Sequence, residues 1–166
     1  MNMTRLHNAD KKWKLWLSFV AICFLNACAG RTELVALGPS YQSRPLSNSE
    51  ARVVVLWPTD QSFGSGVIPR VLINGIDIGK LEPLGYADAI VSPGQVTIAV
   101  RSEYVDRDGN LTKSAGNLVI FGKPGSEIFV EYSVAFGLLA PTLSLKELPV
   151  SVGLEKAKLV RKTVNN

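Results

Sequence analysis

The sequence predicts an all-β protein: a single β-sandwich of mainly antiparallel strands with a short C-terminal helix, preceded by a signal peptide. Beyond residue 50 the chain consists of short runs rich in Val, Ile, Tyr and Phe, separated by turn residues about every ten positions. Several of these runs alternate apolar and polar residues, which is the period of a strand with one solvated face. Only one segment, near the C-terminus, has helical spacing.

The first predicted strand is the continuous apolar run ARVVVLW at residues 51–57, which suits a strand buried on both faces or an inner sandwich strand. The strongest local signal is Asn74-Gly75, which predicts a type I′ hairpin between strands at 70–73 and 76–81. That turn requires positive φ at both central residues, and Asn and Gly tolerate it best. The remaining predicted strands are 86–91, 95–105, 117–122 and 127–136.

Near the C-terminus, VGLEKAKLV (152–160) is the segment expected to form the helix. The apolar stretch 133–145 is interrupted by Gly and Pro and does not fit a regular strand throughout. Two roles are open for its Phe136, Leu138 and Leu139. They either cap the sandwich core or form an exposed patch that contacts a partner or lipid headgroups.

The first thirty residues have the layout of a secretory signal. The basic stretch KKWK (11–14) precedes an apolar run from Leu15 to Leu25, and small residues follow. This run is shorter than the roughly 20 residues that cross a bilayer. Two alternatives stay open: an uncleaved anchor spanning residues 13–29, and ordinary signal-peptidase cleavage at Ala27-Cys28-Ala29.

Leu25-Asn26-Ala27-Cys28 resembles a bacterial lipobox, with Leu three positions before the Cys and Ala directly before it. In lipoproteins with this motif the Cys thiol receives a diacylglycerol and the chain is cut just before it, so the resemblance implies lipidation of Cys28. Only a thiol is both nucleophilic and small enough for this role. Asn26 departs from the usual Ala, Ser or Thr. Ala29, where Asp would signal inner-membrane retention, implies the outer membrane.

We therefore expect three parts: a lipoprotein signal peptide (1–27), the lipidated Cys with a tether (28–49) and the β-sandwich domain (50–162). The tether is expected because residues 29–49 are rich in Ser, Gly and Pro and have no lasting period. Leu34, Val35 and Leu37 could instead add a small strand to the domain.

Charge argues against a nucleic-acid partner. The signal peptide contains four of the 18 basic residues and one of the 14 acidic residues, so the rest of the chain is close to neutral. Phosphate binding needs a clustered basic face, which this balance does not provide. The one basic cluster, Lys156, Lys158, Arg161 and Lys162, is either a solvated end of the domain or a contact to anionic lipid or peptidoglycan.

Catalytic and metal-binding motifs are lacking beyond the signal. His7, the sole histidine, and Cys23 both lie within residues 1–27, which excludes Cys/His zinc sites, Ser-His-Asp hydrolysis and an intramolecular disulfide in the mature chain. DRDGN (106–110) resembles half of a calcium loop, but the closing position is Asn117 in place of Glu. We predict no enzyme, no cofactor and no metal.

Residues 71–100, VLINGIDIGKLEPLGYADAIVSPGQVTIAV, resemble the core of a bacterial envelope lipoprotein family with a domain of unknown function. The match rests on four short motifs and extends loosely over residues 50–160. PEGA-type domains share the hairpin and the Pro-Gly turn. The resemblance implies a lipid-anchored, Ig-like or transthyretin-like β-sandwich and supplies no activity. The four motifs are Asn74-Gly75, Gly79-Lys80-Leu81, Gly85-Tyr86 and Pro93-Gly94.

The expected function is a non-enzymatic binding or scaffolding module that the lipid holds to the cell envelope, facing the periplasm. Its partners would be the membrane and an envelope protein, while the oligomeric state is not determined by the sequence. The alternative is a receptor for a small ligand or glycan. Its pocket would be lined by Trp57, Tyr86, Tyr104 and Tyr132, unless these aromatic residues pack in the core.

Overall fold

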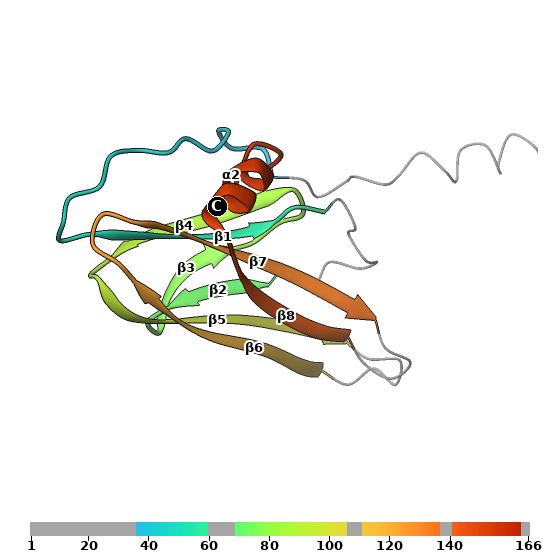
Figure 1. Ribbon diagram of the computed structural model, residues 1–166. Coiled ribbons are helices and arrows are strands. Elements are labelled where there is room, and N and C mark those ends of the chain that lie inside the picture. The colour runs from blue at the N-terminus through green and yellow to red at the C-terminus, as the bar shows by residue number, and fades with distance from the viewer. Residues whose placement is uncertain (1–35, 60–68, 106–110, 137–140, 164–166) are drawn as a thin grey trace, which may run out of the picture. The chain divides into compact units, whose positions relative to one another are not determined.

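A computed structural model describes residues 36–59, 69–105, 111–136 and 141–163 (Figure 1). The described strands form two sheets, sheet A in the order β8-β7-β1-β4-β9 and sheet B in the order β3-β2-β5-β6. The elements are β1 (Ala51–Trp57), β2 (Arg70–Ile73), β3 (Ile76–Lys80), β4 (Gly85–Val91), β5 (Gly94–Val105), β6 (Leu111–Gly122), β7 (Glu127–Phe136), β8 (Pro141–Leu148), α2 (Val150–Ala157) and β9 (Arg161–Lys162).

The main core lies between the two sheets. Alternate residues of β1 and β7 point into it from sheet A, and Val96, Ile98 and Val100 of β5 point into it from sheet B. The rings of Trp57 and Tyr132 meet edge to face within this core, with centroids 5.0 Å apart. The period of two predicted for the β5 segment is therefore confirmed, because its apolar residues are the ones that face sheet A.

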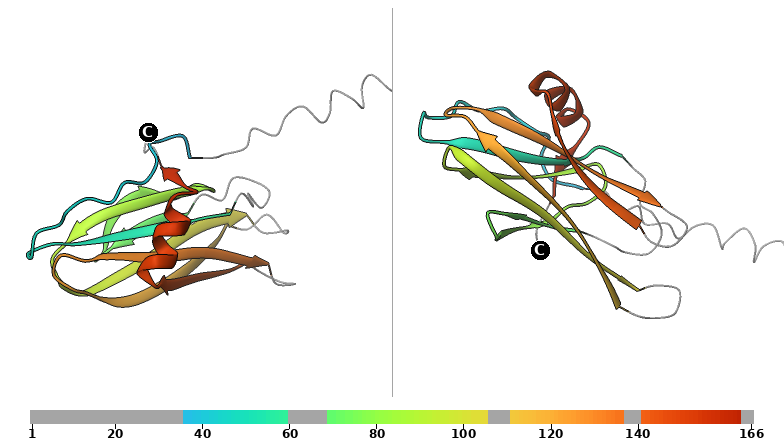
Figure 2. Two further views of the ribbon diagram at one scale, coloured as in Figure 1. Left: turned by 45° about the horizontal axis from the view of Figure 1, so that its top comes forward. Right: turned by 60° about the horizontal axis from the view of Figure 1, so that its bottom comes forward.

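A second apolar cluster covers the opposite face of sheet A. Val54 and Leu56 of β1 contribute to it, which confirms that the run at 51–57 is a strand buried on both faces. Helix α2 lies across this face, as Figure 2 shows. The other buried members of the cluster are Tyr86, Phe129, Leu148, Ala157 and Val160.

The predicted fold class, an all-β sandwich with a short C-terminal helix, is confirmed. The helix begins and ends slightly earlier than the predicted range. Pro149 is its N-cap, whose carbonyl accepts a hydrogen bond from Gly153 N–H, and Lys158 is its C-cap. The Asn74-Gly75 hairpin is also confirmed, with φ of 51° and 80° at the two central residues.

Three details differ from the expectation. Part of the stretch 133–145 is a regular strand, since β8 pairs antiparallel with β7 and places Leu143 and Leu145 towards the core. The strand expected at 117–122 begins at Leu111 and pairs with β5 along its whole length. Two contacts are parallel, β1 with β7 and β4 with β9, because the connections between these strands are long enough for crossovers.

Candidate functional site

The segment that precedes β1 is docked on the domain, which corrects the expectation of a free tether up to residue 49. Ala36 is buried and its N–H donates to the carbonyl of Pro83. Gly38 N–H donates to Lys162 O at 3.0 Å, and Lys162 N–H donates to Pro39 O at 2.8 Å. These bonds and the isolated bridge between Ser40 and Arg161 cover the edge of β9, so residues 38–40 extend sheet A there.

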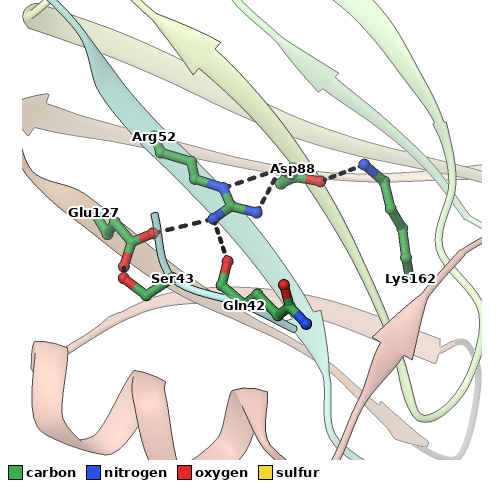
Figure 3. A network of polar contacts seen from close by, with 6 residues as sticks. All are labelled: Gln42, Ser43, Arg52, Asp88, Glu127 and Lys162. Atoms are coloured by element: carbon green, nitrogen blue, oxygen red, sulfur yellow. Dashed lines mark hydrogen bonds and ion pairs between the residues drawn. The ribbon is translucent and has the colours of Figure 1, made fainter. Parts of the chain in front are cut away.

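Arg52 of β1 fixes the next part of this segment. Its side chain lies on the face of sheet A that also holds α2, and only 6% of the residue is exposed. The guanidinium Nε donates to Asp88 Oδ2 at 2.9 Å, and Nη1 donates both to the Gln42 carbonyl at 2.9 Å and to Glu127 Oε1 at 3.1 Å (Figure 3). One cation therefore connects β4, β7 and the segment that precedes β1.

The two carboxylates have further partners. Ser43 Oγ donates to Glu127 Oε2 at 2.7 Å, and Lys162 Nζ lies 3.0 Å from Asp88 Oδ1 as an ion pair. Asp88 of β4 therefore links Arg52 of β1, the middle strand of sheet A, to Lys162 of β9 at its edge. We refer to Gln42, Ser43, Arg52, Asp88, Glu127 and Lys162 together as the Arg52 network.

The ring of Tyr41 packs between the Arg52 network and the apolar cluster on the same face of sheet A. Its ring meets Tyr86 and Phe129 edge to face, with centroids 5.5 Å and 5.7 Å apart. The Arg52 guanidinium lies over the same ring, 4.9 Å from its centroid, in a cation–π arrangement. An aromatic ring thus covers the Arg52 guanidinium, whose two ion pairs are largely buried.

Burial and neighbouring charges shift the pKa values of two groups here, Asp88 of the network and the adjacent Tyr41. Burial alone raises the pKa of Asp88, but the cations Lys162 and Arg52 at its oxygens outweigh this and hold it below the usual 3.8. The pKa of the Tyr41 hydroxyl is raised, first by burial and second by the neighbouring Glu127. Asp88 is therefore ionised and Tyr41 neutral at physiological pH.

This arrangement of charges holds the segment that precedes β1 against sheet A. Each described charge of the Arg52 network has an opposite charge or a carbonyl in contact, which is what buried ion pairs require. One feature of the sequence indicates the Arg52 network. Arg52 is the only charged residue in an otherwise apolar strand, and such a residue in a strand buried on both faces needs partners.

The structure does not gather the predicted aromatic residues into one pocket. Trp57 and Tyr132 lie in the core between the sheets, whereas Tyr86 lies on the opposite face of sheet A. All three are buried, so packing is the role that the structure gives them. The side chains of Tyr104, Phe136, Leu138 and Leu139, the calcium-like DRDGN loop and Cys28 lie outside the described residues.

The basic cluster of the C-terminal region is largely paired. Lys156 contacts Glu131, Lys158 contacts Glu155, and Lys162 contacts Asp88. In the described part of the chain, His, Cys, Asp and Glu side chains nowhere gather in threes that could hold a metal ion. No helix within the same ranges is long and apolar enough to cross a membrane.

These observations define the class of protein as a β-sandwich with a docked N-terminal segment. No protein-family model matches the sequence, and comparisons with curated proteins and with solved structures likewise find no match. The lipobox and envelope-lipoprotein resemblances therefore rest on the sequence motifs alone.

Proposed function

We propose that this protein is a lipid-anchored lipoprotein of the cell envelope that acts as a non-enzymatic binding or scaffolding module facing the periplasm. The observation on which the proposal depends is Leu25-Asn26-Ala27-Cys28, placed directly after a basic stretch and a short apolar run. Cys28 would take the lipid. Ala29 favours the outer membrane as the site of anchoring.

The docked segment supports a mechanical role for the anchor. Seven residues lie between Cys28 and Ala36, the first docked residue of the described ranges, and the eight Cα–Cα steps between the two span at most about 30 Å when extended. The sandwich would thus be held close to the membrane surface. A short tether of this kind raises the effective concentration of the module for any neighbour in the same envelope layer.

The pairing of the docked segment fits this role. Backbone bonds to β9 and the Arg52 network together join the segment to β1, β4, β7 and β9. Tension on the lipid would be transmitted to four strands of sheet A and not to a single loop. The receptor alternative has less support, because Trp57, Tyr86 and Tyr132 are buried and do not line a common pocket.

The test compares two cysteine replacements in the full chain. Cys28→Ala should abolish incorporation of radiolabelled palmitate and release the protein from washed membranes. Cys23→Ala, in the apolar run, is the matched control and should keep both properties. Mass spectrometry of the N-terminus shows whether the signal has been removed. Continued palmitate labelling of Cys28→Ala would refute the lipid anchor.

A further inference from the structure

The open edges of the two sheets are not protected alike. Natural β-proteins guard an exposed edge with charged side chains, bulges, short strands or a covering segment, because an unguarded edge pairs with other strands. In sheet A, the edge of β9 is covered by the segment at Gly38 and Pro39, and β8 presents exposed Lys146 and Glu147. Both edges of sheet A are therefore guarded.

Sheet B has one guarded edge and one that is not. β3 is five residues long, contains Asp77 and Lys80, and has an irregular register where it meets β2 at Val71 and Leu72. β6 lies at the other edge of sheet B (Figure 1). It runs for 12 residues in unbroken register with β5. Among the described strands, β6 is hydrogen-bonded to β5 alone.

The unguarded part of β6 is residues 117–122. Near Gly116, β6 approaches Leu143 of β8, where the two sheets come together. The following six residues, NLVIFG, contain no charge and no proline. Val119 and Phe121 are 57% and 70% exposed on the outer face of sheet B. An apolar, regular and uncharged edge of this kind is a site for strand pairing.

We propose that residues 117–122 pair antiparallel with the same residues of a second copy of this protein. A two-fold axis at Ile120, perpendicular to the sheet, places Val119 of one copy directly opposite Phe121 of the other, and the reverse. An aromatic residue opposite a β-branched one is a favourable cross-strand pair. Each copy would thus supply both members of the pair, as a closed two-fold interface requires.

The surroundings of this register agree with it. Lys123 of one copy comes opposite Asn117 of the other, so no like charges face one another. The neighbouring residues on β5, Gln95 beside Phe121 and Thr97 beside Val119, are uncharged and lie on the same exposed face. The two four-stranded sheets would join into one sheet of eight strands. This inference does not depend on the lipid anchor.

The first test is the mass of the full chain in detergent solution, measured by analytical ultracentrifugation over a range of concentrations. The wild type should be a dimer, and Phe121→Lys should raise the dissociation constant at least tenfold. Ile76→Lys is the matched control, since Ile76 is also 70% exposed but lies on the guarded β3 edge. A monomeric wild type, or a Phe121→Lys variant that dimerises normally, overturns the proposal.

The second test fixes the register and does not depend on how Phe121→Lys folds. Val119→Cys and Phe121→Cys chains with different tags are produced together, oxidised in intact cells and compared with chains lacking these substitutions. The mixed disulfide should exceed either like-with-like disulfide several-fold, because only directly opposite residues have suitable Cβ separations. Equal amounts of the three products, or disulfides to a different protein, contradict pairing between copies.

Discussion

Gly153 of α2 lies directly against the ring of Phe129 in β7. A Cβ built on Gly153 would be 2.2 Å from Phe129 Cγ, a distance that forces one of the two elements to move. The helix therefore approaches sheet A as closely as its backbone allows, and Gly153 is the reason it can.

The first prediction concerns this contact. Gly153→Ala should lower the free energy of unfolding by about 1–3 kcal/mol, the usual cost of overpacking, although the same change in an exposed helix would stabilise by up to about 1 kcal/mol. Urea unfolding measures the difference. Ser151→Ala, at an exposed position of the same helix, is the control and should change little. A variant as stable as the wild type would show that α2 does not rest on Phe129.

The second prediction concerns the docked segment. A Cβ on Gly38 would lie 2.2 Å from the carbonyl oxygen of Lys162, so Gly38→Ala should detach the segment from β9. Amide hydrogen exchange at positions 38 and 162, whose N–H groups bond across this contact, should become faster, while the core strands stay protected. Gly116→Ala serves as the control, because its Cβ would have its nearest neighbour at an ordinary 3.6 Å. Unchanged exchange in Gly38→Ala would contradict the docking.

Periodicity and turn chemistry were sufficient to predict most of the sandwich. The alternation in β5 and the Asn74-Gly75 turn each depend on neighbouring residues only, and both are confirmed. The parallel pairing of β1 with β7 joins residues about 75 positions apart, as in Arg52 beside Glu127, and no local pattern encodes it. β8 was missed because Gly and Pro before it obscured a short alternation at Leu143 and Leu145.

The docked segment and the Arg52 network were not predictable for the same reason. Residues 36–49 have the composition of a linker, and the partners that hold them are backbone groups of β9 and side chains of β1, β4 and β7. Composition describes what a segment can do alone, whereas docking depends on surfaces that exist only after folding. Arg52, isolated in an apolar run, was the one local sign that polar partners had to be supplied from elsewhere.

The third prediction concerns Arg52. Arg52→Gln should lower the free energy of unfolding by about 3–5 kcal/mol, because it leaves Glu127 and one side of Asp88 buried without a cation. Arg70→Gln is the matched control. It breaks an Arg–Asp pair with Asp77 that is largely exposed, and such pairs contribute at most about 1 kcal/mol. Equal losses in the two variants would show that the Arg52 network is not buried in solution.

A double variant separates two contributions to this loss of stability: the missing Arg52–Asp88 ion pair, and the cost of leaving the Asp88 carboxylate buried without its cation. Adding Asp88→Asn to Arg52→Gln removes one of the two carboxylates and should recover part of the lost stability. Additive losses would contradict direct coupling between the two side chains, since residues in contact normally show an interaction energy of about 0.5–3 kcal/mol.

The fourth prediction concerns pH. The pKa of Asp88 is lower in the folded protein than its usual 3.8, so its ionised form stabilises the fold above that value. This contribution is lost as the pH falls from 3.8 through the lower, folded-state pKa. The difference in unfolding free energy between the wild type and Asp88→Asn should therefore be largest near pH 7 and shrink below about pH 4. Urea unfolding of both proteins across this pH range measures the difference.

Lys162→Met removes one of the two cations beside Asp88. Because Lys162 helps to lower the pKa of Asp88, this variant should lose the contribution of Asp88 to stability at a higher pH than the wild type does. A difference that stays constant from about pH 7 to about pH 2 would mean that the two cations do not hold the Asp88 carboxylate in its charged form.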